Sequence, residues 1–223
     1  MDLTPPLILV MWSAGLAAGG ALVARWNVVG PGYSWLASGV VVIFGFPAAG
    51  AGGEPIAWVG LAFAVLAGIA GRSSLAATAL FGASAVAFGV SGLGDSPVLP
   101  IITGAVFLGA VTSEMMLGHW YLVDPRLPRW SLKGLVVIGT AGLAADVGYL
   151  ATEGVFDWEE AGTALGLAFI ALGLATVLLS SGVWFSLKVP RYTGVMAATG
   201  LGYLATLTAI GVAVVGRMVA FPG

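Results

Sequence analysis

The residues of this chain that could do chemistry gather in one stretch, from Thr112 to Arg129. It holds the only histidine, His119, and the carboxylate Glu114, and it ends in a loop with two arginines. The surrounding sequence is mostly Ala, Gly, Leu and Val. An ionisable group inside a membrane span costs about 2.5–3.5 kcal/mol on insertion scales, so each one is a candidate functional residue if this stretch lies in a bilayer.

Glu114 has three interpretations. It is a protonated carboxyl hydrogen-bonded to a neighbouring helix, a proton-accepting or quinone-facing group, or part of a cation site. Five residues at about 100° each separate it from His119 by roughly 140° around a helix. Each residue must therefore find its partner on another helix, in a ligand or in another subunit.

His119 is followed by Trp120 and Tyr121. The imidazole can bond a backbone carbonyl or a lipid phosphate, or it can donate to a quinone carbonyl in a site lined by the two aromatic residues. It can also be an axial ligand of haem or of a chlorophyll-type pigment, or bind copper with Met115 or Met116, because thioether and imidazole suit that metal.

Other polar residues have simpler interpretations. Asp146 is a second intramembrane carboxylate and a candidate proton-handling group, although Gly139 and Gly142 on its helix face favour a tight helix contact with a polar tie. Arg126, Arg129 and Lys133 are candidates for contact with anionic lipid headgroups or with a partner protein.

Composition places all these residues in a membrane. The 223 residues are 59% hydrophobic and only 8% charged, with a mean hydropathy of +1.05, whereas soluble domains carry about 25% charged residues. The absence of cysteine excludes disulfides and thiol chemistry, and a single histidine excludes multi-histidine zinc sites. We predict no metal site, and a net charge of −2 indicates no nucleic-acid partner.

The apolar runs predict an all-α polytopic transmembrane bundle of about eight spans. One integral membrane domain covers residues 1–223, and the second span is expected to be short or to break near Pro47. The expected spans are 6–24, 35–49, 56–71, 75–92, 98–123, 131–151, 161–187 and 193–215.

Charge in the loops predicts the orientation. With eight spans, seven of the eight basic residues follow odd-numbered spans, and the other loops carry acidic residues such as Asp2, Glu54, Asp95 and the cluster from Glu153 to Glu160. Because cytoplasmic loops are enriched in Lys and Arg, we expect both termini outside and a prokaryotic-type cytoplasmic (inner) membrane. Arg217 is the exception, and we expect it to snorkel to the headgroups.

A weak repeat relates two hairpins. Gly118–Tyr121 followed by Pro125 and Arg126 resembles Gly182–Phe185 followed by Pro190 and Arg191. This predicts that hairpins 98–151 and 161–215 are degenerate copies.

These features favour an integral membrane subunit of a respiratory or photosynthetic electron-transfer complex, associated with other membrane subunits. It would scaffold or complete a quinone, haem or pigment site near the cytoplasmic face, with His119, Trp120, Tyr121 and Glu114 as cofactor-binding residues. The topology resembles that of the membrane-anchor subunits of some bacterial oxidoreductases. The alternative is a proton-coupled transporter of ions or small molecules that uses Glu114 and Asp146. We see no nucleophile–base constellation in the sequence, so nothing indicates that the protein is an enzyme on its own.

Overall fold

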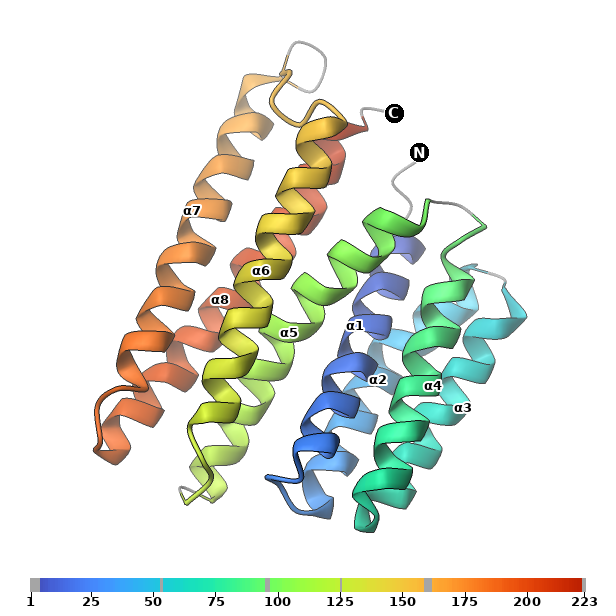
Figure 1. The fold of residues 1–223 in the computed structure, drawn as a ribbon. Helices are drawn as coiled ribbons and strands as arrows, with labels where there is room; N and C mark the ends of the chain where they lie inside the picture. The colour runs from blue at the N-terminus through green and yellow to red at the C-terminus, as the bar shows by residue number, and fades with distance from the viewer. Residues whose placement is uncertain (1–4, 53, 95–96, 125, 159–161, 222–223) are drawn as a thin grey trace.

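The computed structural model describes residues 5–52, 54–94, 97–124, 126–158 and 162–221, and it is an all-α bundle (Figure 1). The described residues form eight α-helices, each long and apolar enough to cross a membrane. The predicted polytopic membrane fold is therefore confirmed. The helices are α1 (Pro5–Trp26), α2 (Pro31–Gly52), α3 (Pro55–Ile69) with the short 3₁₀ turn η1 (Ala70–Arg72), α4 (Ser74–Ser91), α5 (Val98–Val123), α6 (Trp130–Thr152), α7 (Thr163–Ser186) and α8 (Tyr192–Ala220).

Two helices differ from the sequence-based expectation. α2 begins at Pro31, four residues earlier than expected, and it continues through Pro47 to Gly52 rather than breaking there. Proline suits a helix start because the first N–H has no intrahelical partner, and interior prolines are tolerated in membrane helices. α8 ends at Ala220, five residues later than expected, because Arg217 lies inside the bundle.

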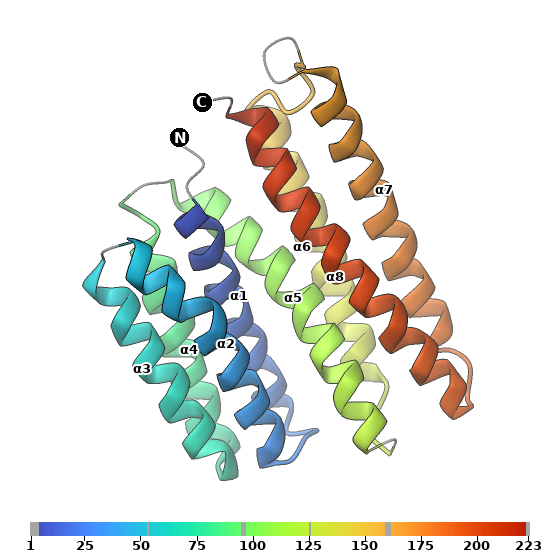
Figure 2. The same cartoon turned by 180° about the vertical axis from the view of Figure 1, so that it is seen from behind.

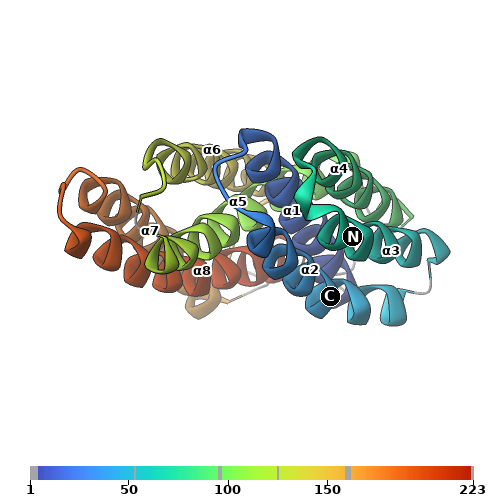
Figure 3. The same ribbon diagram turned by 90° about the horizontal axis from the view of Figure 1, so that it is seen from below.

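The helices form two groups of four, α1–α4 and α5–α8, which meet where α1 packs against α5 (Figures 1 and 2). Viewed along the helices, the bundle is elongated, with α7 and α8 at one extreme and α3 and α4 at the other (Figure 3). Large apolar side chains are exposed on its sides, including Leu75, Leu178 and Ile43. These surfaces contact the lipid bilayer.

Consecutive helices run antiparallel, so α1 begins and α8 ends at the same end of the bundle (Figure 1). We call the opposite end the basic end, because seven basic residues gather there in or beside the connecting turns. They are Arg25, Arg72, Arg126, Arg129, Lys133, Lys188 and Arg191. The other end, the acidic end, carries Glu54, Glu153 and Asp157, while Asp2, Asp95, Glu159 and Glu160 lie outside the described residues.

Helix α5 occupies the centre because small residues let its neighbours approach closely. A Cβ placed on Gly109 of α5 would overlap the backbone of Gly15 in α1. On the other side, a Cβ on Gly142 of α6 would lie 2.7 Å from the backbone nitrogen of Phe107. Only glycine permits such backbone contacts between membrane helices. The tight contact predicted for the Gly142 face of α6 is therefore confirmed.

Candidate functional site

The seam between α5 and α8 holds the carboxylate that sequence analysis singled out. Glu114 of α5 is 3% exposed and points at Gly202 of α8, where a Cβ would lie 2.7 Å from its Oε2 atom. The missing side chain of Gly202 therefore makes the room that the carboxyl fills. Among the described residues, Oε1 of Glu114 has no hydrogen-bond partner.

An unpartnered carboxyl oxygen in this setting needs an explanation. Burying a polar group without a hydrogen bond costs about 1–3 kcal/mol by mutational measures, and a buried charge normally lies beside an opposite charge. No ion pair of Glu114 is found in the described part of the chain. A neutral, protonated carboxyl is the form that costs least in this place.

His119 also contacts α8, at Tyr203, the residue that follows Gly202. Its Nδ1 atom lies 3.1 Å from the hydroxyl oxygen of Tyr203, and the two rings meet edge to face with centroids 6.4 Å apart. Both side chains are exposed on the side of the bundle. On the same seam, Gly118 of α5 packs against Thr199 of α8. The seam therefore presents a buried carboxyl beside Gly202 and an imidazole–phenol pair that faces outward, with His119 about one turn nearer the basic end than Glu114 along α5.

The two aromatic residues after His119 point elsewhere. Trp120 packs over Gly32 of α2 and meets Tyr33 edge to face, with ring centroids 6.2 Å apart. Tyr121 is buried, and its hydroxyl lies 3.4 Å from the hydroxyl of Ser131 in α6. The four predicted cofactor-binding residues thus contact three different helices. Among these four residues, only Glu114 and His119 contact the same helix, α8.

Asp146 has a partner that the sequence did not reveal. Its carboxylate forms an ion pair with Arg217 of α8, and both side chains are 0% exposed. The expectation that Arg217 snorkels to the headgroups is therefore wrong. The guanidinium also donates to the carbonyl oxygens of Pro100 and Ala213, at 3.2 Å each. Since these bonds satisfy most of its donors, the interior position costs less than it would for a lone arginine.

The same carboxylate accepts a hydrogen bond from Thr103 of α5, at 2.8 Å. The pair therefore joins α5, α6 and α8, and Nη2 of Arg217 also lies 3.6 Å from the sulfur of Met11 in α1. The predicted polar tie at Asp146 is confirmed by these bonds. A carboxylate held in this way has its charge balanced and its oxygens bonded, which distinguishes it from Glu114.

The three basic residues predicted to contact lipid or a partner have different neighbours. Arg129 donates hydrogen bonds to backbone carbonyls in the turn between α7 and α8, those of Leu187, Val189, Pro190 and Arg191. Lys133 lies over the ring of Trp184 in α7, 5.5 Å from its centroid. Arg126 is exposed and pairs with Asp124 at 3.1 Å. Hydrogen bonds from the Arg126 side chain and backbone lower the pKa of the Asp124 carboxyl.

No group of three or more potential metal ligands occurs in the part of the chain that the structure describes. No protein-family model, curated protein or solved structure matches this chain.

Proposed function

We propose that this protein is a membrane subunit of an electron-transfer complex, in which the pair formed by His119 and Tyr203 contacts a quinone and Glu114 exchanges a proton. The protein is a multi-pass helical membrane protein in contact with lipid. The observation that carries the proposal is the arrangement of two chemically different groups on the α5–α8 seam. One is a buried carboxyl with an unpartnered oxygen, and the other is an imidazole–phenol pair on the outer surface.

The surface pair suits a quinone head. Quinones reside in the bilayer, so a site for them must open to lipid, and His119 and Tyr203 both lie at the side of the bundle. A quinone carbonyl oxygen accepts hydrogen bonds, and the bonded pair keeps one donor for it. That donor is Nε2–H of His119 when the Tyr203 hydroxyl donates to Nδ1, and the Tyr203 hydroxyl when Nδ1 donates to the phenol oxygen. The edge-to-face rings also offer an aromatic surface against which a flat ring can pack.

Glu114 supplies the proton step. Reduction of a quinone to a quinol takes up two electrons and two protons, and the electrons would come from a haem or iron–sulfur centre in a partner subunit. Glu114 lies five residues from His119 on α5, about 7.5 Å along the helix. A protonated carboxyl at that distance can deliver a proton through one or two waters and take another from the basic end.

Asp146 does not have this role in the proposal. Its charge is balanced by Arg217, and Thr103 occupies one of its oxygens. Releasing or taking up a proton there would break an ion pair that joins several helices. Glu114 is therefore the carboxyl assigned to proton exchange.

The test is binding of a quinone analogue to the protein purified gently from its native membrane. Tyr203→Phe removes one hydroxyl and should weaken binding about fivefold, since a net hydrogen bond contributes about 1 kcal/mol. The matched control is Tyr192→Phe, which removes another exposed hydroxyl from α8. That hydroxyl is bonded to the Leu122 carbonyl of α5, and the variant should bind the quinone analogue normally. Equal binding by both variants and by the parent protein would contradict the quinone site.

The absorption spectrum and the co-purifying polypeptides test the complex itself. A haem or pigment band, together with partner subunits in the mass spectrum, is expected. A colourless monomer without partners would overturn the assignment to an electron-transfer complex.

A second candidate is a proton-coupled carrier, and one observation favours it. The two four-helix groups meet along α1 and α5 through glycine contacts, and carriers commonly rock one bundle against another. Glu114→Gln should then abolish proton-driven uptake into liposomes, whereas Glu54→Gln at the exposed acidic end should not. Unchanged uptake by the Glu114 variant would remove this candidate.

A further inference from the structure

Helices α6 and α7 leave a groove between them, whereas the corresponding pair in the first half of the bundle, α2 and α3, does not separate in this way. There, α2 and α3 pack closely, and a Cβ on Gly68 of α3 would lie 2.8 Å from the Cβ of Ser38 in α2. α6 and α7 instead touch at few points, and two cavities of about 580 and 300 Å³ lie between them. Thr140 and Ala144 line both cavities, so the two cavities adjoin along α6, and we call them together the α6–α7 groove.

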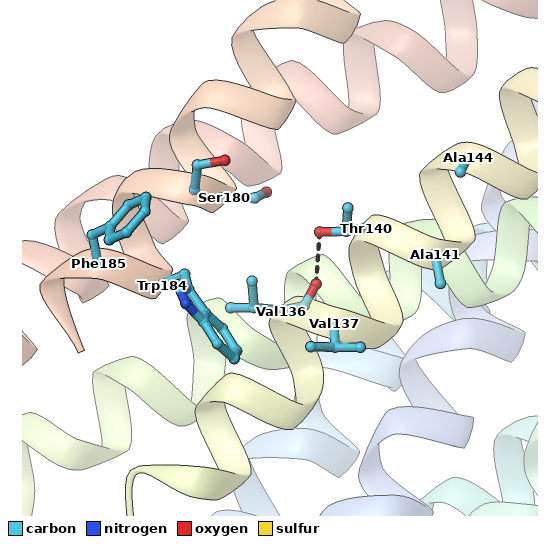
Figure 4. A pocket seen from close by; sticks show the side chains of 9 residues that line it. Val136, Val137, Thr140, Ala141, Ala144, Ser180, Trp184 and Phe185 are labelled. Carbon is cyan, nitrogen blue, oxygen red and sulfur yellow. Dashed lines mark hydrogen bonds between the residues drawn. The ribbon is translucent and has the colours of Figure 1, made fainter. Parts of the chain in front are cut away.

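The groove is lined mostly by apolar side chains, and the polar side chains on its wall are the hydroxyl residues Thr140, Ser180 and Ser181. Figure 4 shows Val136 of α6 beside Trp184 of α7, while Val137 and Ala141 line the larger cavity further along α6. The hydroxyl of Thr140 donates to the Val136 carbonyl in its own helix, at 2.8 Å (Figure 4). Its polar atom is therefore satisfied. These walls suit a hydrocarbon chain better than a polar solute.

Two lysine side chains, Lys133 and Lys188, lie at the basic end of the groove. Lys133 lies over the ring of Trp184 and Lys188 over the ring of Phe185, with 5.5 and 4.7 Å to the ring centroids. Both rings line the larger cavity. Cation–π contacts of this kind hold an ammonium group beside an apolar surface while leaving donors for an anion. The basic mouth of the groove is therefore built for a negatively charged head.

The other mouth is different. Phe156 and Phe169 meet edge to face at 6.2 Å and line the smaller cavity, and the nearby end of α6 carries the exposed Glu153. An anionic head would be repelled there. Fifteen residues separate Phe169 from Trp184, about 22 Å of helix, which exceeds half of the ~30 Å hydrocarbon core. A whole lipid chain therefore fits inside the groove.

We propose that the α6–α7 groove holds one acidic phospholipid, with its phosphate at Lys133 and Lys188 and its acyl chains between the two helices. The charge at the two mouths sets its direction, and the apolar walls hold the chains. This site is separate from the α5–α8 seam and does not depend on quinone binding.

Native mass spectrometry of the full chain in detergent tests the proposal, with phosphatidylglycerol and phosphatidylcholine of identical acyl chains as probes. The parent protein should retain phosphatidylglycerol at least tenfold more than phosphatidylcholine, because each lysine near an acidic lipid contributes roughly a fivefold preference. The double variant Lys133→Gln/Lys188→Gln should lose this preference. Arg25→Gln/Arg72→Gln removes the same charge at the same end of the other half, and it should keep the preference.

A second variant tests the groove itself. Ala144→Trp fills the space shared by both cavities and should abolish retention of phosphatidylglycerol. Ala62→Trp on the exposed face of α3 is the matched control and should retain the lipid, with circular dichroism verifying that both variants are folded. Three outcomes would overturn the proposal. The first is equal retention of the two lipids by the parent protein, and the second is an equal effect of the double lysine variant and the double arginine variant. The third is a co-purifying polypeptide that is lost only in Ala144→Trp.

Discussion

Arg217 and Asp146, seventy-one residues apart, form a two-point ion pair inside the bundle: Nη1 lies 3.0 Å from Oδ2 and Nη2 lies 2.8 Å from Oδ1. The pair joins α8 to α6, and Thr103 extends it to α5. Because the surrounding helices are short of polar groups, this cluster fixes how α6 and α8 are placed against the central helix. It is a structural centre, in contrast to Glu114.

Removing one member of this pair should destabilise the protein strongly. Asp146→Asn or Arg217→Met leaves the other group buried without its full set of partners, which costs about 3–5 kcal/mol. The double variant Asp146→Leu/Arg217→Met removes both charges and should recover most of that loss. Thermal unfolding in detergent measures the effect. Additive losses in the double variant would show that the two residues act independently.

The close contact between α1 and α5 should not tolerate a side chain at Gly109. Gly109→Ala places a methyl group on the backbone of Gly15 and should destabilise the protein by about 1–3 kcal/mol, since overpacking forces the backbones apart. Gly148→Ala on α6 adds a methyl group where the space is open, and it should be neutral or slightly stabilising. Chemical unfolding of the two variants provides the comparison, and equal stability would contradict the close crossing.

Arg129 should act as a structural clamp on the α7–α8 turn. Its guanidinium donates to four carbonyls there, and Arg129→Met leaves them without these charge-assisted bonds. Hydrogen exchange should become faster in residues 187–191 in this variant. Arg126→Met, at an exposed position on the neighbouring turn, should leave exchange in those residues unchanged. A similar pattern in both variants would argue against the clamp.

The Asp124 carboxyl gives a pH dependence whose sign is defined. Its pKa is lowered by the hydrogen bonds from Arg126, so the contact is present above the ordinary aspartate pKa and is lost as the pH falls through the lowered value. Carboxyl carbon chemical shifts measured against pH should show this low transition, and Arg126→Gln should move it upward. A transition unaffected by the variant would rule out the contact in solution.

Hydropathy predicts the helices well because membrane spans must satisfy their own backbone hydrogen bonds. The bounds of α5 agree with the prediction at both ends. Helical angles also separate Glu114 from His119 correctly. Which helix each residue meets depends on how side chains interlock, and that information is spread along the whole chain.

Two features of the structure were not predicted from the sequence, the ion pair of Arg217 with Asp146 and the α6–α7 groove. The pairing of Arg217 with Asp146 could have been suspected from the sequence. Asp146 lies in the last six residues of the predicted span 131–151, and Arg217 follows the predicted span 193–215 by two residues. Both spans end at the same side, and the two side chains carry opposite charges. The groove between α6 and α7 was not predicted, because consecutive helices are usually adjacent in space. The ten-residue connection between them, 153–162, permits a wider separation.

The most direct test of the proposed proton exchange is infrared difference spectroscopy of the carbonyl stretch of protonated carboxyls, recorded when the bound quinone is reduced. We predict a band that shifts in D₂O, changes on reduction, and is absent from Glu114→Gln but present in Glu54→Gln. A band that persists in Glu114→Gln, or a spectrum in which no carboxyl responds to reduction, would contradict the role of Glu114.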